Sequence, residues 1–517
     1  MVTASAPPSA FNFAQHLITR NAPRDGRVAY IDDRTRLSYG ELARGIAEFA
    51  GVLREHGLRR EERVLLLAHD SIEWPIAFLG SIHGGVVPVA LNTLLTADDY
   101  AYVLSHSRAR AAIVSAALMP TFEQALQRGE HDVETIWVIG STSAPAAGRR
   151  DFNADLERAQ PAEPVRTHAD DVAFWLYSSG STGAPKGTLH THANLYWTNA
   201  LYAQNVLRLR EDDVCFSAAK LFFAYGLGNA LTFPLSAGAT TVLMAERPTP
   251  QAVFRRLVEQ QPTVFFGVPT LYAAMLAAPD LPKRDAVAMR VCVSAGEALP
   301  RDIGERFTAH FGSEILDGIG STEMLHIFLS NRAGDVHYGT TGVPVPGYDV
   351  QLRGEDGGPV ADGEVGDLYI RGPSAALMYW TNRDKSRATF QGEWTKSGDK
   401  YVRRADGCYV YAGRGDDMLK VSGLYVSPFE VEAALVQHPA VLEAAVIGKF
   451  DADGLTKTKA FVVLKPGAAQ EGLEDTLKAF VKDKLAPYKY PRAIEFIAEL
   501  PKTATGKIQR FRLRERG

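Results

Sequence analysis

The sequence predicts an α/β protein with a large N-terminal domain, in which helices flank mixed parallel sheets, and a small α+β C-terminal domain. Apolar runs of strand length alternate with segments of helical spacing through the first part of the chain, which favours parallel sheets covered by helices. Glycine and proline become frequent from about Gly342 onward, and the short alternating strands there predict a β-rich subdomain. A self-contained pattern of helices and strands follows Asp416. We therefore predict two domains, 1–415 and 416–517.

Local signals predict the elements of the N-terminal domain. Ser38 and Glu41 have the spacing of a capping box, and the helix that they open carries apolar residues at helical spacing, namely Leu42, Ile46, Phe49 and Leu53. Further helices are predicted over 71–83 and 96–105. Strands are predicted over 64–68, 86–90, 111–114, 172–177, 240–244, 263–268, 290–294 and 314–316. Strands that alternate with helices in this way indicate parallel sheets.

The same reasoning applies to the last third of the chain. Strands are predicted over 365–371 and 409–412 in the β-rich subdomain, and over 441–448, 459–464 and 494–497 in the C-terminal domain. Ser427 is placed as the N-cap of a helix, with Pro428 at its first position and Glu430 in its first turn. A second helix is predicted over 473–485.

Composition excludes several classes of protein. A chain of 517 residues is too long for a single core. The net charge is −4 without an extended run of like charges, so neither a nucleic-acid footprint nor a membrane-binding basic face is indicated. No signal peptide is visible at the N-terminus, and no apolar run approaches the ~20 residues that span a bilayer. The three cysteines lie too far apart for a metal pattern. A soluble cytoplasmic enzyme is expected.

One stretch predicts a site for phosphates. Residues 177–187 contain glycines, hydroxyl side chains and Lys186, directly after a predicted buried strand. Glycines let several backbone N–H groups point the same way and form a nest for anions. A flexible linker is less consistent with the preceding strand. The stretch is not a Walker A motif, because Pro185 precedes the lysine and Gly187 follows it where Ser or Thr would be required.

This stretch resembles the phosphate loop of the adenylate-forming enzymes, which include acyl-CoA synthetases, luciferases and the adenylation domains of peptide synthetases. Four further motifs resemble that family in the same order along the chain. They are Gly-Ser-Thr-Glu at 320–323, Ser-Gly-Asp at 397–399, Gly-Arg-x-Asp-Asp at 413–417 and Pro-Lys-Thr-x-Thr-Gly-Lys at 501–507. Each motif alone is weak, but five in the family's order cover nearly the whole chain.

The resemblance implies a reaction in which a carboxylate joins the α-phosphate of ATP, giving an acyl-adenylate and pyrophosphate. Two anions must meet, so cations and N–H donors must stabilise the charge. The implied binding residues for the β- and γ-phosphates are Ser178, Ser179, Gly180, Ser181, Thr182, Gly183 and Lys186. Thr322 is expected to contact the α-phosphate, and Glu323 to bind Mg²⁺, which prefers hard oxygen ligands.

The nucleoside would lie against other residues. By resemblance, Asp399 accepts hydrogen bonds from both ribose hydroxyls, with Arg414 as its partner. The adenine wall is expected at Gly296, Glu297 and Asp317. Ile319 stands where many relatives have a tyrosine that stacks on adenine, and apolar packing can replace that stacking.

The C-terminal domain is expected to be mobile. Lys507 resembles the lysine that bridges the carboxylate and the α-phosphate. For the second half reaction, in which the thiolate of coenzyme A attacks the adenylate, family members rotate this domain about a hinge that corresponds to Asp416. Lys420 and Gly423 would then arrive at the site, where glycine allows close approach of a pantetheine arm. Tyr425 departs from the arginine of many relatives.

The acyl pocket is expected at Phe223, Ala224, Tyr225, His326 and Ile327. No acidic residue lies between positions 220 and 240, which argues against a substrate with an ammonium group. The segments 220–226 and 320–328 look closest to those of benzoate–CoA ligases. His326 could lie near the carboxylate or be a core histidine bonded to backbone.

Several alternatives stay open at this stage. The acid could be a substituted benzoate, a heteroaromatic acid or a medium-chain acid. The enzyme could instead load a separate carrier protein, or the chain could bind ATP without ligase activity. Benzoate, ATP and coenzyme A are the expected small-molecule partners, and the sequence leaves open whether the chain forms a homodimer. No role is assigned to His190 or His192.

Overall fold

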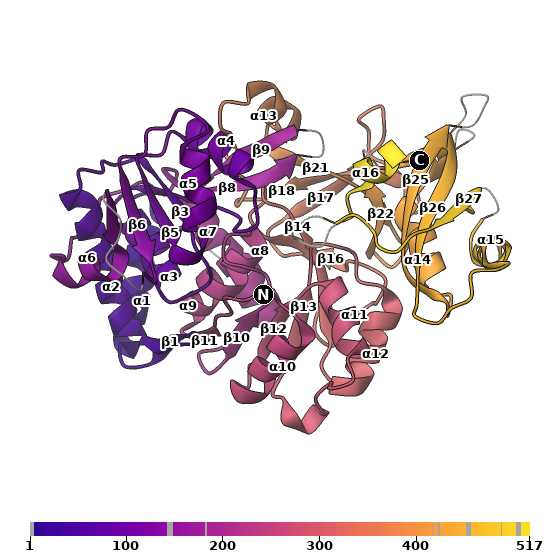
Figure 1. Ribbon diagram of the computed structural model, residues 1–517, viewed down its shortest axis with the longest axis horizontal. Coiled ribbons are helices and arrows are strands. Elements are labelled where there is room, and N and C mark those ends of the chain that lie inside the picture. The colour runs from indigo at the N-terminus through magenta and orange to yellow at the C-terminus, as the bar shows by residue number, and fades with distance from the viewer. Residues whose placement is uncertain are drawn as a thin grey trace. The chain divides into compact units, whose positions relative to one another are not determined.

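A computed structural model describes residues 5–141, 148–180, 183–415, 417–421, 424–450, 456–486, 489–502 and 508–516 (Figure 1). The chain divides into two compact units, residues 1–350 with 370–396 and residues 351–369 with 397–517. The second unit therefore takes in strands that the sequence assigned to the N-terminal domain. Asp416 lies outside the described residues, and the predicted boundary at this position stays a prediction.

The first unit contains an eight-stranded mixed sheet in the described chain, in the order β19-β9-β8-β4-β3-β5-β6-β7. Its central strands β8, β4, β3, β5 and β6 pair in parallel, whereas β8 and β9 are antiparallel. The bounds are β3 Arg63–Leu67, β4 Val87–Ala90, β5 Ala111–Ser115, β6 Thr135–Ile139, β7 Arg149–Asp151, β8 Val172–Gly180, β9 Gly183–Thr191 and β19 Met378–Tyr379. The strands predicted around 64–68, 86–90 and 111–114 are confirmed.

A second sheet of the first unit has the order β16-β15-β14-β13-β12-β10-β11-β1-β2. Strands β1 and β10 to β14 pair in parallel, so the carboxyl ends of β12, β13 and β14 meet at one edge. Open α/β sheets bind ligands at this edge. The bounds are β1 Val28–Ile31, β2 Arg36–Ser38, β10 Val214–Ser217, β11 Thr240–Val242, β12 Val264–Gly267, β13 Val291–Ser294, β14 Ile315–Gly320, β15 Ile327–Ser330 and β16 Val343–Pro344.

Helices cover the strands of the first unit (Figure 1). They are α1 Phe13–Asn21, α2 Tyr39–Glu55, α3 Glu73–His83, α4 Ala97–Ser107, α5 Met119–Leu126, α6 Phe152–Arg158, α7 His192–Thr198, α8 Ala224–Leu227, α9 Phe233–Ala237, α10 Pro250–Glu259, α11 Pro269–Ala277, α12 Arg301–Phe311 and α13 Arg383–Thr389. Short 3₁₀ turns lie at Ala22–Arg24, Ala116–Leu118 and Arg284–Ala286, and π-helical segments continue α7 over Asn199–Leu207 and α8 over Gly228–Thr232.

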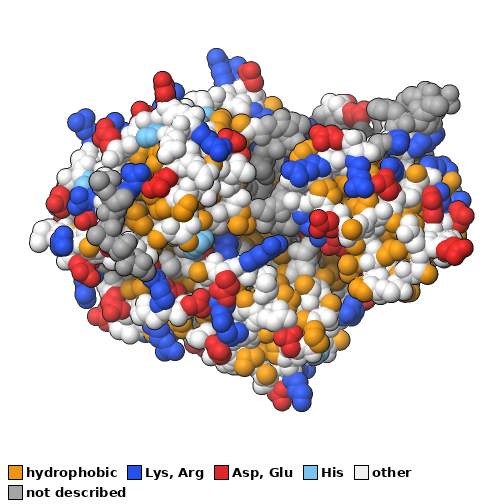
Figure 2. Space-filling model, viewed as in Figure 1, with side chains coloured by type: hydrophobic (Ala, Val, Ile, Leu, Met, Phe, Trp, Pro, Cys, Tyr) orange, Lys and Arg blue, Asp and Glu red, His pale blue; other side chains and the backbone are white. Residues whose placement is uncertain are grey.

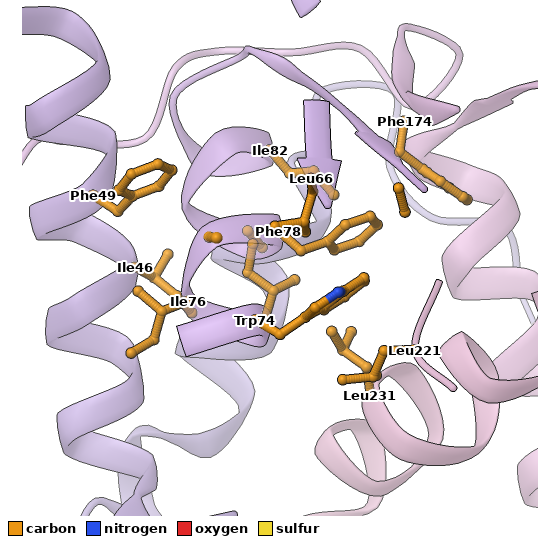
Figure 3. Packing of buried hydrophobic residues seen from close by; sticks show 14 of the residues in the cluster. Ile46, Phe49, Leu66, Trp74, Ile76, Phe78, Ile82, Phe174, Leu221 and Leu231 are labelled. Atoms are coloured by element: carbon orange, nitrogen blue, oxygen red, sulfur yellow. The ribbon is translucent and has the colours of Figure 1, made fainter. Parts of the chain in front are cut away.

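The capping box predicted for α2 is present, because the side chain of Ser38 accepts from the N–H of Glu41 and the Glu41 carboxylate accepts from the N–H of Ser38. The apolar face of α2 packs on α3, where Trp74 and Phe78 stack with ring centroids 5.0 Å apart (Figure 3). Gly80 permits this approach, since a Cβ there would lie 2.9 Å from Cβ of Phe49.

A further sheet contains β17 Asp349–Arg353, β18 Val365–Arg371, β20 Phe390–Gln391, β21 Trp394–Arg403 and β22 Tyr409–Arg414. The second unit also contains β23 Leu419–Val421, β24 Leu424–Val426, α14 Pro428–Val436, β25 Val441–Phe450, β26 Thr456–Leu464, α15 Leu473–Lys484, β27 Ala493–Phe496 and α16 Arg510–Arg516. Ser427 caps α14 as predicted, by accepting from the N–H of Glu430. The last helix, α16, was not predicted, although Leu513 buries its side chain.

Charged side chains of both signs are interspersed over the face shown in Figure 2, which agrees with the small net charge of −4. None of the helices in the described part of the chain combines the length and the apolar character that crossing a bilayer requires.

Candidate functional site

The predicted phosphate loop is the tip of the β8–β9 hairpin. Tyr177 pairs with Gly187, and Ser178 pairs with Lys186. The strand predicted over 172–177 is present and runs on to Gly180, because antiparallel pairing with β9 continues into the glycine-rich stretch. Ser181 and Thr182 lie outside the described residues, and Ser179, Gly180 and Gly183 are described only by their places in the two strands. Oγ of Ser178 is buried and has no hydrogen-bond partner in the described chain.

Lys186 and Glu323 both contact the side chain of Tyr379, Lys186 at the face of the ring and Glu323 at the hydroxyl. The ammonium of Lys186 is 4.7 Å from the centroid of the Tyr379 ring, a cation–π geometry. The hydroxyl of Tyr379 donates a hydrogen bond of 2.7 Å to Oε1 of Glu323. Tyr379 itself is buried, at 2% exposure. The structure therefore brings together one predicted phosphate ligand and the predicted magnesium ligand.

The chain from Ser321 to His326 links β14 to β15, which are antiparallel with Gly318 opposite Ser330. Leu325 has a φ of +66°, a conformation that costs a non-glycine residue about 1–3 kcal/mol. Other segments hold this loop in place. The N–H of Ala376 donates to the carbonyl of Glu323 at 2.8 Å, and Oγ of Ser374 donates to the carbonyl of Met324 at 2.8 Å.

The donor set at Glu323 fits a magnesium ion. Mg²⁺ is usually held by one or two carboxylates together with substrate phosphates. The side chain of Glu323 is half-buried, and only its Oε1 takes part in the bond with Tyr379. Its second oxygen is a hard ligand of the required kind. Thr322, the predicted contact of the α-phosphate, is the preceding residue and is also half-buried.

The predicted adenine wall combines exposed and buried residues. Gly296 is exposed and Glu297 is half-buried, whereas Asp317 is 4% exposed. Asp317 lies next to Ser294 in the parallel pair β13–β14, and burial raises the pKa of its carboxyl well above the usual range. Ile319 is half-buried opposite Leu329. The contact of these residues with adenine stays a prediction.

Asp399 and Arg414, the predicted ribose pair, are neighbours in the second unit. They lie opposite each other in β21 and β22, and Nη1 of Arg414 donates to Oδ1 of Asp399 at 3.1 Å. The N–H of Asp399 donates to Oγ of Ser397 at 2.9 Å, within strand β21. The two side chains are thus bonded to each other, and their contact with ribose stays a prediction.

The predicted acyl residues gather at the carboxyl ends of β12 and β13. The hydroxyl of Tyr225 lies 3.2 Å from the carbonyls of both Gly267 and Val293. Its ring centroid is 5.6 Å from that of His326. Phe223 and Ala224 are half-buried beside Tyr225, and Ile327 is buried in β15. The lining is therefore largely apolar and aromatic.

His326 is a neutral imidazole. It is 3% exposed, and burial lowers its pKa to about 3. Its Nε2 lies 3.1 Å from Oδ1 of Asn229, so this nitrogen carries the proton and donates. Besides the Asn229 side chain, the backbone of Tyr225 forms a hydrogen bond with the ring, which raises its pKa and agrees with the alternative of a core histidine bonded to backbone.

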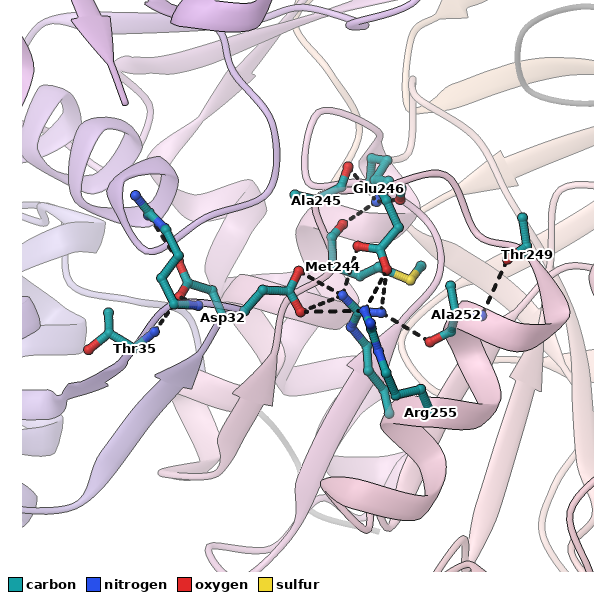
Figure 4. A network of polar contacts seen from close by, with 12 residues as sticks. Asp32, Thr35, Met244, Ala245, Glu246, Thr249, Ala252 and Arg255 are labelled. Atoms are coloured by element: carbon teal, nitrogen blue, oxygen red, sulfur yellow. Dashed lines mark hydrogen bonds and ion pairs between the residues drawn. The ribbon is translucent and has the colours of Figure 1, made fainter. Parts of the chain in front are cut away.

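The segment that leads into the acyl residues is held by Asp70 and Lys220. The N–H of Leu221 donates to Oδ1 of Asp70 at 3.2 Å. Nζ of Lys220 donates to the carbonyl of Met244 and, at 2.7 Å, to that of Glu246. Glu246 in turn bonds the arginines of α10 (Figure 4). Burial raises the pKa of Asp70 to about 6.

Sequence reasoning missed several residues of this region. Tyr379, Asn229, Tyr202, Phe233 and Asn194 all contact predicted site residues or their supports. Asn229 could have been noticed, because it is a polar residue within an apolar run. Tyr379 gave no local signal, since its partner Glu323 is distant in sequence.

Other predicted residues cannot be placed. Lys507, Asp416 and Gly423 lie outside the described residues, as does the side chain of Lys420. Their roles stay predictions.

Comparison with known proteins agrees with the motifs. A family model described as AMP-binding enzyme matches residues 18–380, and one described as AMP-binding enzyme C-terminal domain matches residues 430–507. The chain is 59% identical over 513 residues to a benzoate–CoA ligase of Thauera aromatica, covering 98% of this chain and 96% of the relative. It is 49% identical over 525 residues to a 4-hydroxybenzoate–CoA/benzoate–CoA ligase of Rhodopseudomonas palustris, covering 98% and 95%.

A solved structure gives the same result for the fold. The crystal structure of a benzoate CoA ligase from Burkholderia xenovorans LB400 has a TM-score of 0.91 and 62% identity, and the match covers 98% of this chain and all of that one. The predicted resemblance to adenylate-forming enzymes is thus confirmed. Matched over most of its length by the family model and by full-length relatives, the chain belongs to the AMP-binding enzyme family.

Proposed function

We propose that this protein is an ATP-dependent benzoate–CoA ligase. In the first half reaction, a carboxylate oxygen of benzoate attacks the α-phosphorus of ATP, and pyrophosphate leaves. In the second, the thiolate of coenzyme A attacks the carbonyl carbon of benzoyl-AMP, and AMP leaves with the electron pair of the broken C–O bond. The observation that carries the proposal is 59% identity to the Thauera aromatica benzoate–CoA ligase over 98% of the chain.

The site residues support this chemistry. Lys186 supplies a positive charge at the hairpin that would bind the β- and γ-phosphates, and Mg²⁺ at Glu323 would neutralise further phosphate charge. Thr322 would donate to the α-phosphate. Buried His326 and Ile327, together with half-buried Tyr225, would provide a largely apolar surface for the ring. Lys507 would orient the two anions during adenylation.

The test measures release of AMP and pyrophosphate across a panel of acids, with and without coenzyme A. With benzoate we expect pyrophosphate in both cases, and rapid release of AMP together with benzoyl-CoA only when coenzyme A is present. Rapid release with a long-chain acid and none with benzoate would overturn the substrate assignment. Benzoyl-AMP that accumulates without transfer to coenzyme A would instead support the alternative of a carrier protein as acceptor.

A substituted benzoate is the second candidate substrate. The Rhodopseudomonas palustris relative, at 49% identity, is named for both 4-hydroxybenzoate and benzoate. Competition between benzoate and 4-hydroxybenzoate for the same enzyme decides which acid has the higher kcat/KM.

Light scattering during gel filtration tests whether the chain is a homodimer.

A further inference from the structure

His190 lies in β9, the strand that leaves the predicted phosphate loop. It pairs with Phe174 of β8, and the two rings stack with centroids 5.2 Å apart and an interplanar angle of 15°. Its side chain is fully buried. A buried histidine needs partners for its polar nitrogens, so the groups around the ring indicate its state.

Both nitrogens of His190 face oxygen atoms. Nε2 is 2.8 Å from the carbonyl oxygen of Thr322, and Nδ1 is 3.1 Å from Oδ1 of Asn194. A carbonyl oxygen only accepts, so the bond to Thr322 requires a proton on Nε2.

Backbone groups fix the orientation of the Asn194 amide. Oδ1 accepts from the N–H of Thr191 at 2.9 Å. Nδ2 donates to the carbonyls of Pro373 and Ala375, at 3.2 and 3.3 Å. Exchange of the amide oxygen and nitrogen would lose all three bonds, so Oδ1 does face the imidazole.

Both oxygens are acceptors, so one proton on the ring can satisfy only one of the two contacts. Burial lowers the pKa of His190 to about 4, so the ring carries one proton near neutral pH. We assign the proton to Nε2 because its contact with Thr322 is the shorter one, and Nδ1 then faces Oδ1 of Asn194 without a hydrogen bond. His190 is thus a donor with a single, fixed direction.

The loop that receives this bond is held at three consecutive carbonyls. The carbonyl of Thr322 accepts from His190, and that of Glu323 accepts from the N–H of Ala376. The carbonyl of Met324 accepts from Oγ of Ser374, and each of the three bonds is 2.8 Å long. The strained φ of Leu325 in the same loop means that the loop conformation depends on such external bonds. Among these three donors, only His190 belongs to the phosphate-loop hairpin.

We propose that His190 is a positioning residue for adenylate formation, because its Nε2–H couples the strand that carries Lys186 to the main chain of Thr322. The inference rests on the proposed role of Thr322 at the α-phosphate. His190 touches no substrate. It sets the direction of the Thr322–Glu323 peptide and thereby the place of both side chains.

Two polar substitutions separate this role from packing. In His190→Gln the amide nitrogen can reach the position of Nε2, whereas in His190→Asn it reaches only as far as Nδ1. Both variants lose the stacked ring. The measurement is ATP–pyrophosphate exchange driven by the acid that the wild type activates, with urea unfolding of each variant.

We expect His190→Gln to keep most of the wild-type kcat and His190→Asn to lose about tenfold to a hundredfold, the scale of a displacement of ~1 Å at a reacting centre. The KM for the acid should stay close to that of the wild type in both. His192→Gln is the matched control, because His192 is equally buried but accepts from the N–H of Phe13, away from the loop. It should keep wild-type turnover.

Two results would overturn the proposal. One is wild-type kcat in His190→Asn. The other is an equal loss in His190→Gln and His190→Asn, which would assign the effect to packing. If both variants are too unstable to assay at the usual temperature, the same comparison is made at a lower temperature, where urea unfolding shows that both are folded. Failure of the benzoate assignment would appear separately, as wild-type exchange with another acid, and that acid then serves for the comparison.

Discussion

The hydroxyl of Tyr379 lies 2.7 Å from Oε1 of Glu323 and donates to it, while the ammonium of Lys186 lies over the same ring. Tyr379 is presented by β19, which pairs with β9 so that Tyr379 is opposite Thr188. One buried phenol therefore orients the predicted magnesium ligand and contacts the predicted phosphate ligand. Groups that orient a metal ligand in this way tune its affinity for the ion.

Tyr379→Phe should weaken magnesium binding, because it removes the hydrogen bond to Glu323 and keeps the ring under Lys186. We expect the Mg²⁺ concentration for half-maximal adenylate formation to rise about tenfold. Calorimetric titration of Mg²⁺ into the ATP complex gives a second readout that does not depend on turnover. Tyr379→Leu, which also removes the ring, should raise the KM for ATP as well. An unchanged Mg²⁺ dependence in Tyr379→Phe would contradict this role.

Lys507→Ala should abolish adenylate formation, because the charge that brings carboxylate and α-phosphate together is lost. The variant should still convert supplied benzoyl-AMP and coenzyme A to the thioester. Each half reaction is measured separately, by pyrophosphate exchange and by thioester formation. Loss of both half reactions in a folded variant would contradict the division of roles between the two steps.

Gly228→Ala should impair use of the acid. A methyl group there would lie 2.3 Å from Cδ2 of His326, so the ring must move away from Asn229. Overpacking of this kind costs about 1–3 kcal/mol. We expect a higher KM for benzoate with an unchanged KM for ATP. Gly26→Ala is the matched control, because a Cβ at Gly26 has no neighbour within 4 Å. Equal KM values for benzoate in both variants would place His326 outside the acyl pocket.

Asp70→Asn should change how stability depends on pH. The pKa of Asp70 is raised to about 6 by burial, against an ordinary value near 3.8. At a pH between these two pKa values, Asp70 is protonated in the folded state and ionised in the unfolded state. The free energy of unfolding of the wild type therefore rises as the pH falls from 6 to 4. Above pH 6 the buried carboxylate is charged and its full destabilising effect is present.

The variant keeps the acceptor for the N–H of Leu221 but has no proton to lose. Relative to Asp70→Asn, the wild type should therefore gain roughly 3 kcal/mol between pH 6 and pH 4, from ~2 pH units at ~1.4 kcal/mol each. Urea unfolding of both proteins at pH 7.5, 6 and 4.5 measures this difference. Parallel curves for the two proteins would show that Asp70 does not titrate in this range.

Local signals in the sequence determined many elements of the fold. The capping box of Ser38 and Glu41 opens α2 as predicted, and apolar runs of strand length became β3, β5, β12 and β13. Hydrophobic periodicity and capping act between residues that are close in the chain, so they can be recognised without a structure. The family motifs likewise indicated Thr322, Glu323 and the Asp399–Arg414 pair.

Only the tertiary structure decided how these residues are held. The glycine-rich stretch after Tyr177 was expected to be a loop, yet pairing with β9 extends β8 to Gly180. The sequence assigned no role to His190, whose Nε2 lies 2.8 Å from the carbonyl oxygen of Thr322. It also assigned none to Tyr379, whose hydroxyl donates to the carboxylate of Glu323. Such bonds join segments far apart in sequence, and their energy depends on burial and direction that no local pattern encodes. The sequence therefore predicted which groups the chemistry would use, and the packing of β9 and β19 against the Thr322–Glu323 loop decided the orientation of those groups.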